Sequence, residues 1–484
     1  MALHIAILPT PGIGHLIPLA EFARKLYRRH QISSTFIIPT DQDAPFSPRQ
    51  QTLLATLPPP INHLLLPAVN LHDLPPDVRA ETRIALTVAR SLPSIRAAFK
   101  SLLSSSSPIA AVVVDLFGTD AFEIAREFQL PPYIFFPSTA TCLSLFLHLL
   151  ELHRTTPSEY RDSPEPFRLP GCTPISGEDL VDPLQDRSNS AYQWILHYCR
   201  RYPLAEGIIV NTCTQLEPGP IKALQLQIPN LENPNPKIYP IGPLTHSAAI
   251  SNQMTGPSSS SIILQWLNQQ PIGSVLYVSF GSGGSLRHEQ LIELALGLEL
   301  SEQRFLMVVR CPSDKSASAG YFSTDDSSDP LSYLPDGFLD RTAGRGLAVP
   351  FWAPQVEILE HRCTGGFLTH CGWNSTLESV VSGVPLLLWP LFAEQRMNAV
   401  MLHEELKVGV RVLSESGGGG AVVGREAVAR AVRDLMGGDI GDRNRSRIRD
   451  LKIGAAAAIG EGGASAQAFD QLAERWKEEG ARRK

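Results

Sequence analysis

The chain contains 484 residues, which exceeds the size of one ordinary hydrophobic core and predicts two domains. Hydrophobic residues make up 43% and charged residues 19%, a composition typical of a globular protein that excludes an intrinsically disordered chain. The formal net charge of −6 provides no general attraction for nucleic acid or an anionic membrane, so any anionic ligand must be held by local groups.

The N-terminal sequence and the cysteine pattern indicate a cytoplasmic protein. The first residues, MALHIAILPTPGIGH, lack the basic region of a signal peptide and are typical of a first β-strand. Seven cysteines are scattered without a CxxC pair, which indicates reduced thiols and not a disulfide framework. No segment reaches the roughly 18 apolar residues that span a bilayer, so we expect no membrane span. We also expect a monomer.

Short apolar runs alternate with helical patterns through the first half of the chain. The expected strands are residues 4–10, 34–40, 110–115 and 131–137. After the first strand, apolar residues recur with helical spacing at Leu19, Phe22, Ala23 and Leu26, and a further helix is expected through 142–150. This βαβα order predicts a parallel sheet with helices on both faces.

The same pattern restarts in the second half. A helix is expected over 288–300, and the expected strands are 274–280, 304–310, 346–350, 365–370 and 384–390. The predicted fold class is therefore α/β, with two doubly wound domains.

A segment rich in Pro, Ser and Gly, residues 240–261, separates the two halves and is typical of a linker. The expected boundaries are 1–245 for the first domain, 246–262 for the linker, 263–460 for the second domain and 461–484 for a C-terminal helix. That helix carries Phe469, Leu472 and Trp476 on one face and is expected to pack back toward the first domain. Residues 311–330 and 414–421 lack periodicity and are expected to form surface loops.

Polar residues follow the ends of five expected strands, where open α/β sheets bind their ligands. His15 follows the first strand, and Asp115 ends the apolar strand 110–115. In the second half, Ser282 and His370 each follow a strand, and the pair Glu394–Gln395 follows the last one.

The glycines of PTPGIGH do not complete a dinucleotide fingerprint, because Ile17 occupies the third glycine position. A tight turn into a helix, with Pro18 in its first turn, explains Gly12 and Gly14. His15 is either a solvated side chain or the partner of Asp115, whose burial without a partner would be unfavourable. A His–Asp pair would form a general base with a fixed tautomer.

The segment CGWNSTLESVVSG predicts a capped helix that begins at the ligand edge of the sheet. Asn374 and Ser375 are good N-cap residues, and Gly383 ends the helix. Its expected buried face consists of Leu377, Val380 and Val381. The positive end of the helix favours an anion, to which His370 can donate, while Glu378 can accept from ribose hydroxyls. A helix with a satisfied core histidine remains the alternative.

Metal and hydrolase chemistry are both disfavoured. His370 and Cys371 are adjacent, and neighbouring residues of a strand point to opposite faces, so they do not easily share one zinc ion. The chain has no G-x-S-x-G motif, so a serine hydrolase is not expected. We predict no metal site.

The segment from Trp352 to Gln395 closely resembles the signature box of plant family 1 UDP-glycosyltransferases. PTPGIGHLIP, VVVDLFGTDAF, YPIGPL, SFGSGG and SEQRFL resemble further blocks of that family, so the likeness covers nearly the whole chain. It is closest to the group of hydroquinone glucosyltransferases (arbutin synthases) and phenol or monolignol glucosyltransferases. The resemblance implies a GT-B fold of two facing Rossmann-like domains, with the acceptor in the first and UDP-glucose, a co-substrate, in the second.

The resemblance also implies roles for individual donor-site residues. Trp352 stacks on uracil and the backbone of Ala353 contacts it, while Gln355 and Glu378 bind the ribose. The diphosphate is held by Ser282, His370, Asn374 and Ser375. Trp373, Glu394 and Gln395 contact the sugar. Trp373 with a terminal Gln395 goes with UDP-glucose in this family, whereas a terminal His would suggest UDP-galactose.

The implied activity is inverting transfer of glucose from UDP-glucose to a small phenolic acceptor, with no bound cofactor. His15 matches the catalytic base and Asp115 its acidic partner. The expected acceptor pocket consists of Ile84, Leu92, Leu116, Phe117 and Phe392. Broad O-, N- or C-glycosylation of flavonoids or xenobiotics is the alternative activity, and a sugar-nucleotide-binding protein is the alternative without catalysis.

Departures from the family pattern are few. Arg362–Cys363 replaces a more usual Pro–Ser, Met307 replaces a usual Trp, and Phe392 stands where Tyr is common. Only Phe392 is expected beside the substrates.

Overall fold

The computed structural model describes residues 3–44, 46–75, 77–104, 109–226, 236–248, 250–251, 257–318, 320–322, 328–412 and 421–482. The chain divides into two compact units, each described below by itself. The first comprises Met1–Gly177, Pro183–Thr245 and Ala455–Lys484, and the second Glu178–Asp182 and His246–Gly454. Parts of the expected linker (249 and 252–256) and of the expected loops (319, 323–327 and 414–420) lie outside the described residues.

Parallel strands form the central sheet of the first unit. Their order is β3 (Ile61–Leu65), β2 (Ser33–Ile38), β1 (His4–Leu8), β4 (Ile109–Asp115), β5 (Pro132–Phe136), β6 (Gly207–Val210) and β7 (Lys237–Pro240). The chain order reverses between β1 and β4, which makes the carboxyl ends of these two strands a topological switch point.

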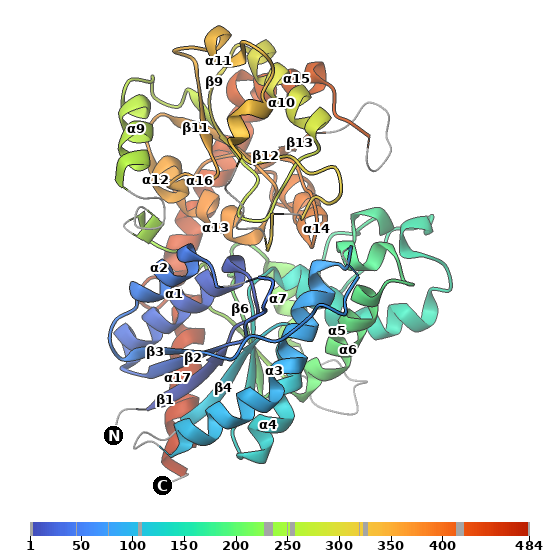
Figure 1. The fold of residues 1–484 in the computed structure, drawn as a ribbon, viewed down its shortest axis with the longest axis vertical. Helices are drawn as coiled ribbons and strands as arrows, with labels where there is room; N and C mark the ends of the chain where they lie inside the picture. Colours follow the sequence, from blue (N-terminus) through green and yellow to red (C-terminus); the bar gives the residue numbers. More distant parts are fainter. Residues whose placement is uncertain are drawn as a thin grey trace. The chain divides into compact units, whose positions relative to one another are not determined.

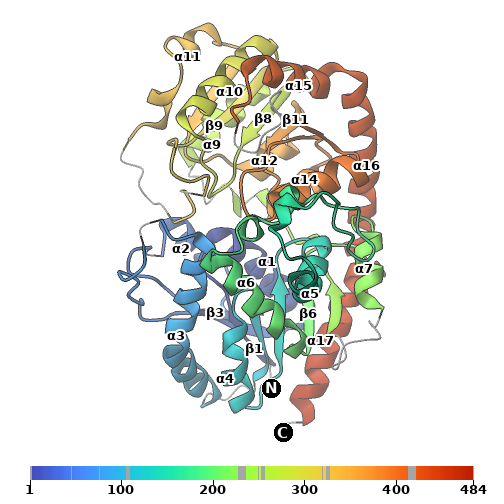
Figure 2. The same ribbon diagram turned by 90° about the vertical axis from the view of Figure 1, so that its right-hand side faces the viewer.

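Helices lie on both faces of this sheet (Figures 1 and 2). They are α1 (Ile13–His30), α2 (Pro48–Ala55), α3 (Ala80–Leu103), α4 (Phe122–Glu127), α5 (Ala140–Thr155), α6 (Ser190–Arg201), α7 (Pro218–Gln225) and α17 (Ala464–Arg482). Short 3₁₀ turns are η1 (Thr119–Ala121), η2 (Tyr160–Asp162) and η5 (Tyr202–Leu204), while η3 (Gly177–Asp179) and η4 (Asp182–Gln185) include residues of Glu178–Asp182, which belongs to the second unit.

Helix α1 packs through the apolar face that its periodicity predicts. Phe22 is fully buried, and its ring lies 5.7 Å from Phe469 and 6.2 Å from Trp476 of α17, and 5.5 Å from Phe135 of β5. The C-terminal helix thus belongs to the core of the first unit. Because α1 already begins at Ile13, Pro18 lies in its second turn, not in the first as expected.

The second unit is built in the same way. Its parallel strands have the order β10 (Gly346–Pro350), β9 (Arg304–Val309), β8 (Val275–Ser279), β11 (Thr364–Thr369), β12 (Leu386–Leu388) and β13 (Gly409–Arg411). Its switch point lies between β8 and β11.

The helices of the second unit are α9 (Pro257–Asn268), α10 (His288–Ser301), α11 (Phe338–Arg341), α12 (Gln355–Glu360), α13 (Trp373–Ser382), α14 (Gln395–Val400), α15 (Arg425–Gly437) and α16 (Asp439–Ile459), the last of which continues into the first unit. A 3₁₀ turn, η6 (Pro330–Tyr333), and a π-helical turn, η7 (Met401–Glu405), complete it. Figure 2 shows α10 and α15 side by side, and their packing buries Leu294, Leu298 and Val432 in one apolar cluster with the sheet.

The described helices include none that is both long enough and apolar enough to cross a membrane. All seven cysteines are present as thiols.

Candidate functional site

A His–Asp pair lies at the switch point of the first unit. Asp115 is the last residue of β4, and His15 lies in the first turn of α1, which follows the neighbouring strand β1. His15 Nδ1 lies 2.9 Å from Asp115 Oδ2; the carboxylate is fully buried, while the imidazole is 18% exposed. Donation by Nδ1–H to the carboxylate leaves Nε2 as the acceptor nitrogen of the neutral ring.

Thr10 completes this pair, although sequence reasoning missed it. Its hydroxyl donates to Asp115 Oδ1 at 2.7 Å and lies 3.4 Å from His15 Nδ1. The carboxylate is therefore held from both oxygens, which fixes the plane in which it meets the imidazole. Thr10 lies two residues after the end of β1, and this position just beyond a strand end was the signal available in the sequence.

The residues expected to bind the acceptor fall into two groups. Leu116 and Phe117 are buried immediately after Asp115, and the Phe117 ring lies 6.0 Å from the His15 ring. Ile84 is buried and Leu92 half-buried on α3, which packs against η1. Phe392, in contrast, belongs to the second unit and is half-buried there.

In the second unit, His370 follows β11 and lies in a cradle made of glycine. A Cβ on Gly372 would lie 2.4 Å from His370 Nε2, and one on Gly281 would lie 2.5 Å from Cε1, so both positions exclude any side chain. Burial lowers the pKa of His370 to about 4, and the ring is therefore neutral near pH 7. Its Nδ1 is buried and has no hydrogen-bond partner among the described residues.

Helix α13 starts next to this histidine, two residues earlier than an N-cap at Asn374 would place it. It begins at Trp373 with Gly372 as its N-cap, so Asn374 and Ser375 lie in the first turn and are not N-cap residues. Gly372 has the extended conformation of an N-cap residue and, being glycine, makes no side-chain cap hydrogen bond. Backbone N–H groups at this end favour an anion.

The remainder of α13 follows the prediction except at Val381. Leu377 and Val380 are fully buried, whereas Val381 is only half-buried. Gly383 ends the helix in the left-handed conformation, with φ of 79°. Ser282, expected at the same anion site, follows β8 on the other side of the switch point and is half-buried.

A network of polar side chains joins α12 to α13. Gln355 Nε2 donates to Glu378 Oε2 at 2.6 Å and to Ser375 Oγ at 2.9 Å. The other carboxylate oxygen, Oε1 of Glu378, lies 3.2 Å from Nδ1 of His246. Glu378 is 5% exposed and His246 8% exposed, so the carboxylate is held between two polar partners away from bulk water.

The pair Glu394–Gln395 begins helix α14. Gln395 is buried, and its Oε1 accepts from the backbone N–H groups of Leu391 at 2.9 Å and Phe392 at 3.0 Å. The amide oxygen is therefore occupied, and the NH₂ group is the part of Gln395 that can donate to a ligand. Asn398 donates to the Cys371 carbonyl at 2.9 Å and thereby joins this helix to the segment before α13.

The remaining residues that were predicted to bind the donor are Trp352, Ala353 and Trp373. Trp352 is half-buried and Ala353 is 4% exposed, both between β10 and α12. Phe351, just before them, has φ of 62°, and this left-handed residue turns the chain between the two elements. Trp373 is 3% exposed at the start of α13.

His246 and Asn398 were not predicted, because His246 lies far in sequence from Glu378 and Asn398 far from Cys371. No group of three or more His, Cys, Asp or Glu in the described residues is arranged to hold a metal ion. Cys371, considered beside His370 as a ligand, has a buried thiol that donates to the Thr369 carbonyl, and burial raises its pKa.

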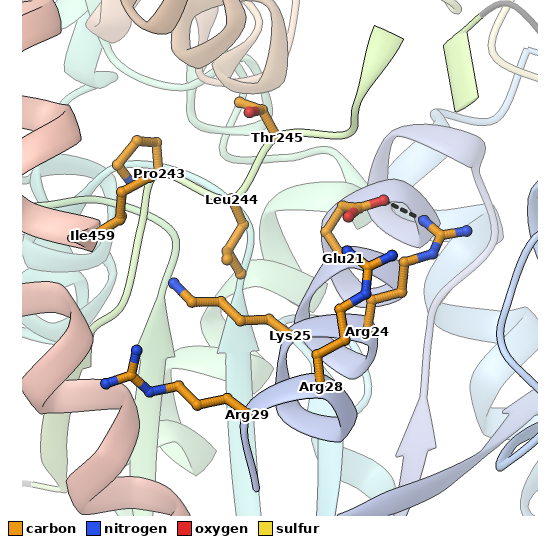
Figure 3. A pocket seen from close by; sticks show the side chains of 9 residues that line it. All are labelled: Glu21, Arg24, Lys25, Arg28, Arg29, Pro243, Leu244, Thr245 and Ile459. Carbon is orange, nitrogen blue, oxygen red and sulfur yellow. Dashed lines mark hydrogen bonds and ion pairs between the residues drawn. The ribbon is translucent and has the colours of Figure 1, made fainter. Parts of the chain in front are cut away.

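A separate pocket of about 430 Å³ lies in the first unit beside the C-terminal half of α1 (Figure 3). Four cationic side chains line it, but Arg24 pairs with Glu21, and Arg29 donates to Asp470 at 2.5 and 2.6 Å. Its arginine charges are thus partly compensated. The pocket is lined by later turns of α1 than the one that carries His15, so we do not assign it to the candidate site.

Comparison with known proteins gives consistent likenesses. Residues 239–416 match the family model described as UDP-glucoronosyl and UDP-glucosyl transferase. Hydroquinone glucosyltransferase of Rauvolfia serpentina is 56% identical over 478 residues, which cover 98% of each chain.

Two solved structures extend these likenesses to the fold. Phytolacca americana UGT2, complexed with UDP-2fluoro-glucose and pterostilbene, is 47% identical with a TM-score of 0.87, covering 99% of this chain and 100% of that one. A Polygonum tinctorium UDP-glucosyltransferase capable of glucosylating indoxyl, complexed with 3,4-dichloroaniline, is 47% identical with a TM-score of 0.88, covering 99% of both chains. The predicted GT-B type fold, with two Rossmann-like domains, is thereby confirmed.

Proposed function

Because the chain belongs to the plant family 1 UDP-glycosyltransferases, we propose that it transfers glucose from UDP-glucose to the hydroxyl group of a small phenol, with inversion at the anomeric carbon. The first unit binds the acceptor and supplies the base, and the second unit binds the donor. The observation that carries this proposal is the 2.9 Å contact between His15 Nδ1 and Asp115 Oδ2 at a sheet switch point.

His15 is proposed as the general base. A phenol becomes a good nucleophile only when its proton leaves, and Nε2 of the neutral imidazole accepts that proton. Asp115 then stabilises the imidazolium that forms, because its buried carboxylate is held by Thr10 and faces Nδ1–H. The freed oxygen attacks the anomeric carbon as the bond to the diphosphate breaks, which inverts the configuration.

The donor site is proposed to run from Trp352 and Ala353, at the uracil, to Glu394 and Gln395, at the sugar. Gln355 and Glu378 bind the ribose; the diphosphate is held by Ser282, His370, Asn374 and Ser375. Trp373 lies at the sugar end. Support comes from the relative complexed with UDP-2fluoro-glucose and from the glycine cradle that fixes His370.

Stabilisation of the leaving diphosphate is proposed to come from the positive end of α13 and from neutral His370. These groups are fixed before the reaction, so no metal is needed in this scheme. Incubation with EDTA is therefore expected to leave the rate of transfer unchanged, and a strict requirement for Mg²⁺ would contradict the scheme.

A phenolic acceptor is proposed from the names of the relatives and from the apolar side chains beside His15. Hydroquinone is the acceptor in the name of one relative. Nitrogen acceptors are the second candidate, because a solved relative is complexed with 3,4-dichloroaniline. We further propose a cytoplasmic enzyme; the cysteines, all present as thiols, support this location. We keep a monomer as the proposed state, which light scattering tests.

The test is to mix the protein with UDP-glucose and hydroquinone and to measure released UDP and the glucoside formed. The His15→Ala variant is expected to lose transfer by about 10² to 10⁴-fold, the usual contribution of a general base. Its affinity for UDP, measured by calorimetry, should remain that of the unmodified protein. Full activity of His15→Ala would exclude the base assignment, and a protein that binds no UDP would exclude the donor site.

A further inference from the structure

A short stretch of the first half of the chain belongs to the second unit. Glu178–Asp182, here called the strap, is assigned to that unit, while the residues on both sides of it belong to the first. Its two central residues, Leu180 and Val181, are 0% and 2% exposed. Burial of these apolar side chains holds the strap in place by the hydrophobic effect.

One strap contact reaches the turn in front of the proposed sugar-binding pair. The backbone N–H of Asp182 donates to the carbonyl oxygen of Ala393 at 2.8 Å. Ala393 has φ of 54°, a left-handed conformation that is unfavourable for a residue with a Cβ. This carbonyl belongs to the peptide group that joins Ala393 to Glu394. The hydrogen bond therefore fixes the orientation of that peptide group, and with it the backbone position of Glu394 and Gln395.

The strap also contacts two residues that follow that turn in the chain. Asp179 forms a two-pronged ion pair with Arg411, the last residue of β13, with N···O distances of 2.8 and 3.4 Å. The two side chains are 15% and 24% exposed, so water screens the pair only in part. Arg396, in the first turn of α14, donates to the Glu178 carbonyl at 3.4 Å.

We propose that the strap positions the sugar-binding turn, and that the Asp179–Arg411 pair therefore contributes to recognition of the hexose of the donor and not of its nucleotide. This inference rests on the proposed function. The contacts described above reach Ala393, Arg396 and Arg411, whereas the side chains proposed to bind the ribose are held by one another and by His246. Asp179 and Arg411 are thus positioning residues that act through the turn.

The experiment compares two ligands that differ only in the sugar. Affinities for UDP and for UDP-2-fluoro-glucose, a poorly transferred donor analogue, are measured by calorimetry for the unmodified protein and for Asp179→Asn and Arg411→Met. Each variant is expected to bind the analogue about fivefold more weakly and to bind UDP with less than about twofold change. Asp179→Glu keeps the charge and is expected to restore most of the affinity.

Glu293→Gln is the matched control, because Glu293 pairs with Arg425 elsewhere in the same unit and is 18% exposed. It should change neither affinity. Equal weakening of both ligands by Asp179→Asn would overturn the proposal, as would unchanged affinity for the analogue. If Asp179→Asn does not fold, Arg411→Met supplies the same comparison. Failure of the unmodified protein to bind UDP would instead refute the proposed function on which the inference rests.

Discussion

At the scale of single residues, His246 contributes a contact to the proposed nucleotide site, although it lies outside the segment Trp352–Gln395 that resembles the family signature. Its Nδ1 lies 3.2 Å from Oε1 of Glu378, whose second oxygen accepts from Gln355. A carboxylate held on both sides presents its remaining lone pairs in fixed directions, which suits two neighbouring ribose hydroxyls. Without His246, one side of the buried carboxylate would lose its partner.

We therefore expect His246→Ala to weaken UDP binding by roughly tenfold, the effect of losing one polar contact worth about 1.4 kcal/mol. The same substitution should change the affinity for 2′,3′-dideoxyuridine diphosphate much less, because that ligand lacks the hydroxyls. Calorimetry of the unmodified protein and of His246→Ala with both ligands measures how much of the loss in affinity depends on the ribose hydroxyls. Equal losses for the two ligands would show that His246 acts on the fold of the site and not on the ribose contact.

At the scale of elements, the junction of β11 and α13 depends on two glycines that make room for one imidazole. Gly372 has φ of −63°, which alanine adopts without strain, so the effect of Gly372→Ala is purely steric. The new Cβ would lie 2.4 Å from His370 Nε2 and must displace the ring. Since α13 begins at the next residue, that displacement occurs at the proposed diphosphate site.

Gly372→Ala is expected to lower the free energy of unfolding by about 1–3 kcal/mol, as overpacking usually does, and to weaken UDP binding. The double variant Gly372→Ala with His370→Ala should recover the stability but not the affinity, because the space returns while the imidazole is lost. Gly437→Ala is the control, since a Cβ there meets nothing within 4 Å. Thermal unfolding and UDP titration of the unmodified protein, Gly372→Ala, the double variant and Gly437→Ala measure the changes in stability and in affinity.

At the scale of the whole molecule, burial lowers the pKa of a histidine strongly in each unit: His4 in the first and His370 in the second. Burial lowers the pKa of His4 to about 4 in the first unit, where its ring nitrogens lie 2.7 and 2.9 Å from the hydroxyls of Ser33 and Thr35. His370 has a pKa of about 4 in the second unit for the same reason. Both values lie below the ordinary histidine value of about 6.5, so the unfolded chain binds protons more readily than the folded one.

Stability is therefore expected to decrease as the pH falls from about 6.5 toward 4, by about 2 kcal/mol for each histidine between pH 7 and pH 5. Denaturant unfolding at these two pH values measures the decrease. The variant His4→Gln lacks the titrating group of the first unit. The decrease in stability that His4 causes should therefore disappear, while the decrease that His370 causes remains. An unchanged slope in His4→Gln would show that other groups dominate.

Local patterns were sufficient for most of the elements but not for their ends or for a strand whose residues are mostly exposed. Helix α1 was predictable because four core residues repeat with its period, and each is fully buried. The strand β3 was not predicted, since four of its five residues are exposed and it has no apolar pattern. The start of α13 was placed too late because a good N-cap residue such as Asn374 was preferred over glycine.

The sequence by itself determined the α/β class, the polar residues at the strand ends and, through its resemblance to a family, the proposed roles of the donor residues. These depend on periodicity and on short motifs, which a chain expresses locally. Only the tertiary structure decided which distant residues meet: Thr10 with Asp115, His246 with Glu378, and the strap with the turn at Ala393. Strand order and the path of the chain create such contacts, and neither leaves a periodic signal in the residues concerned.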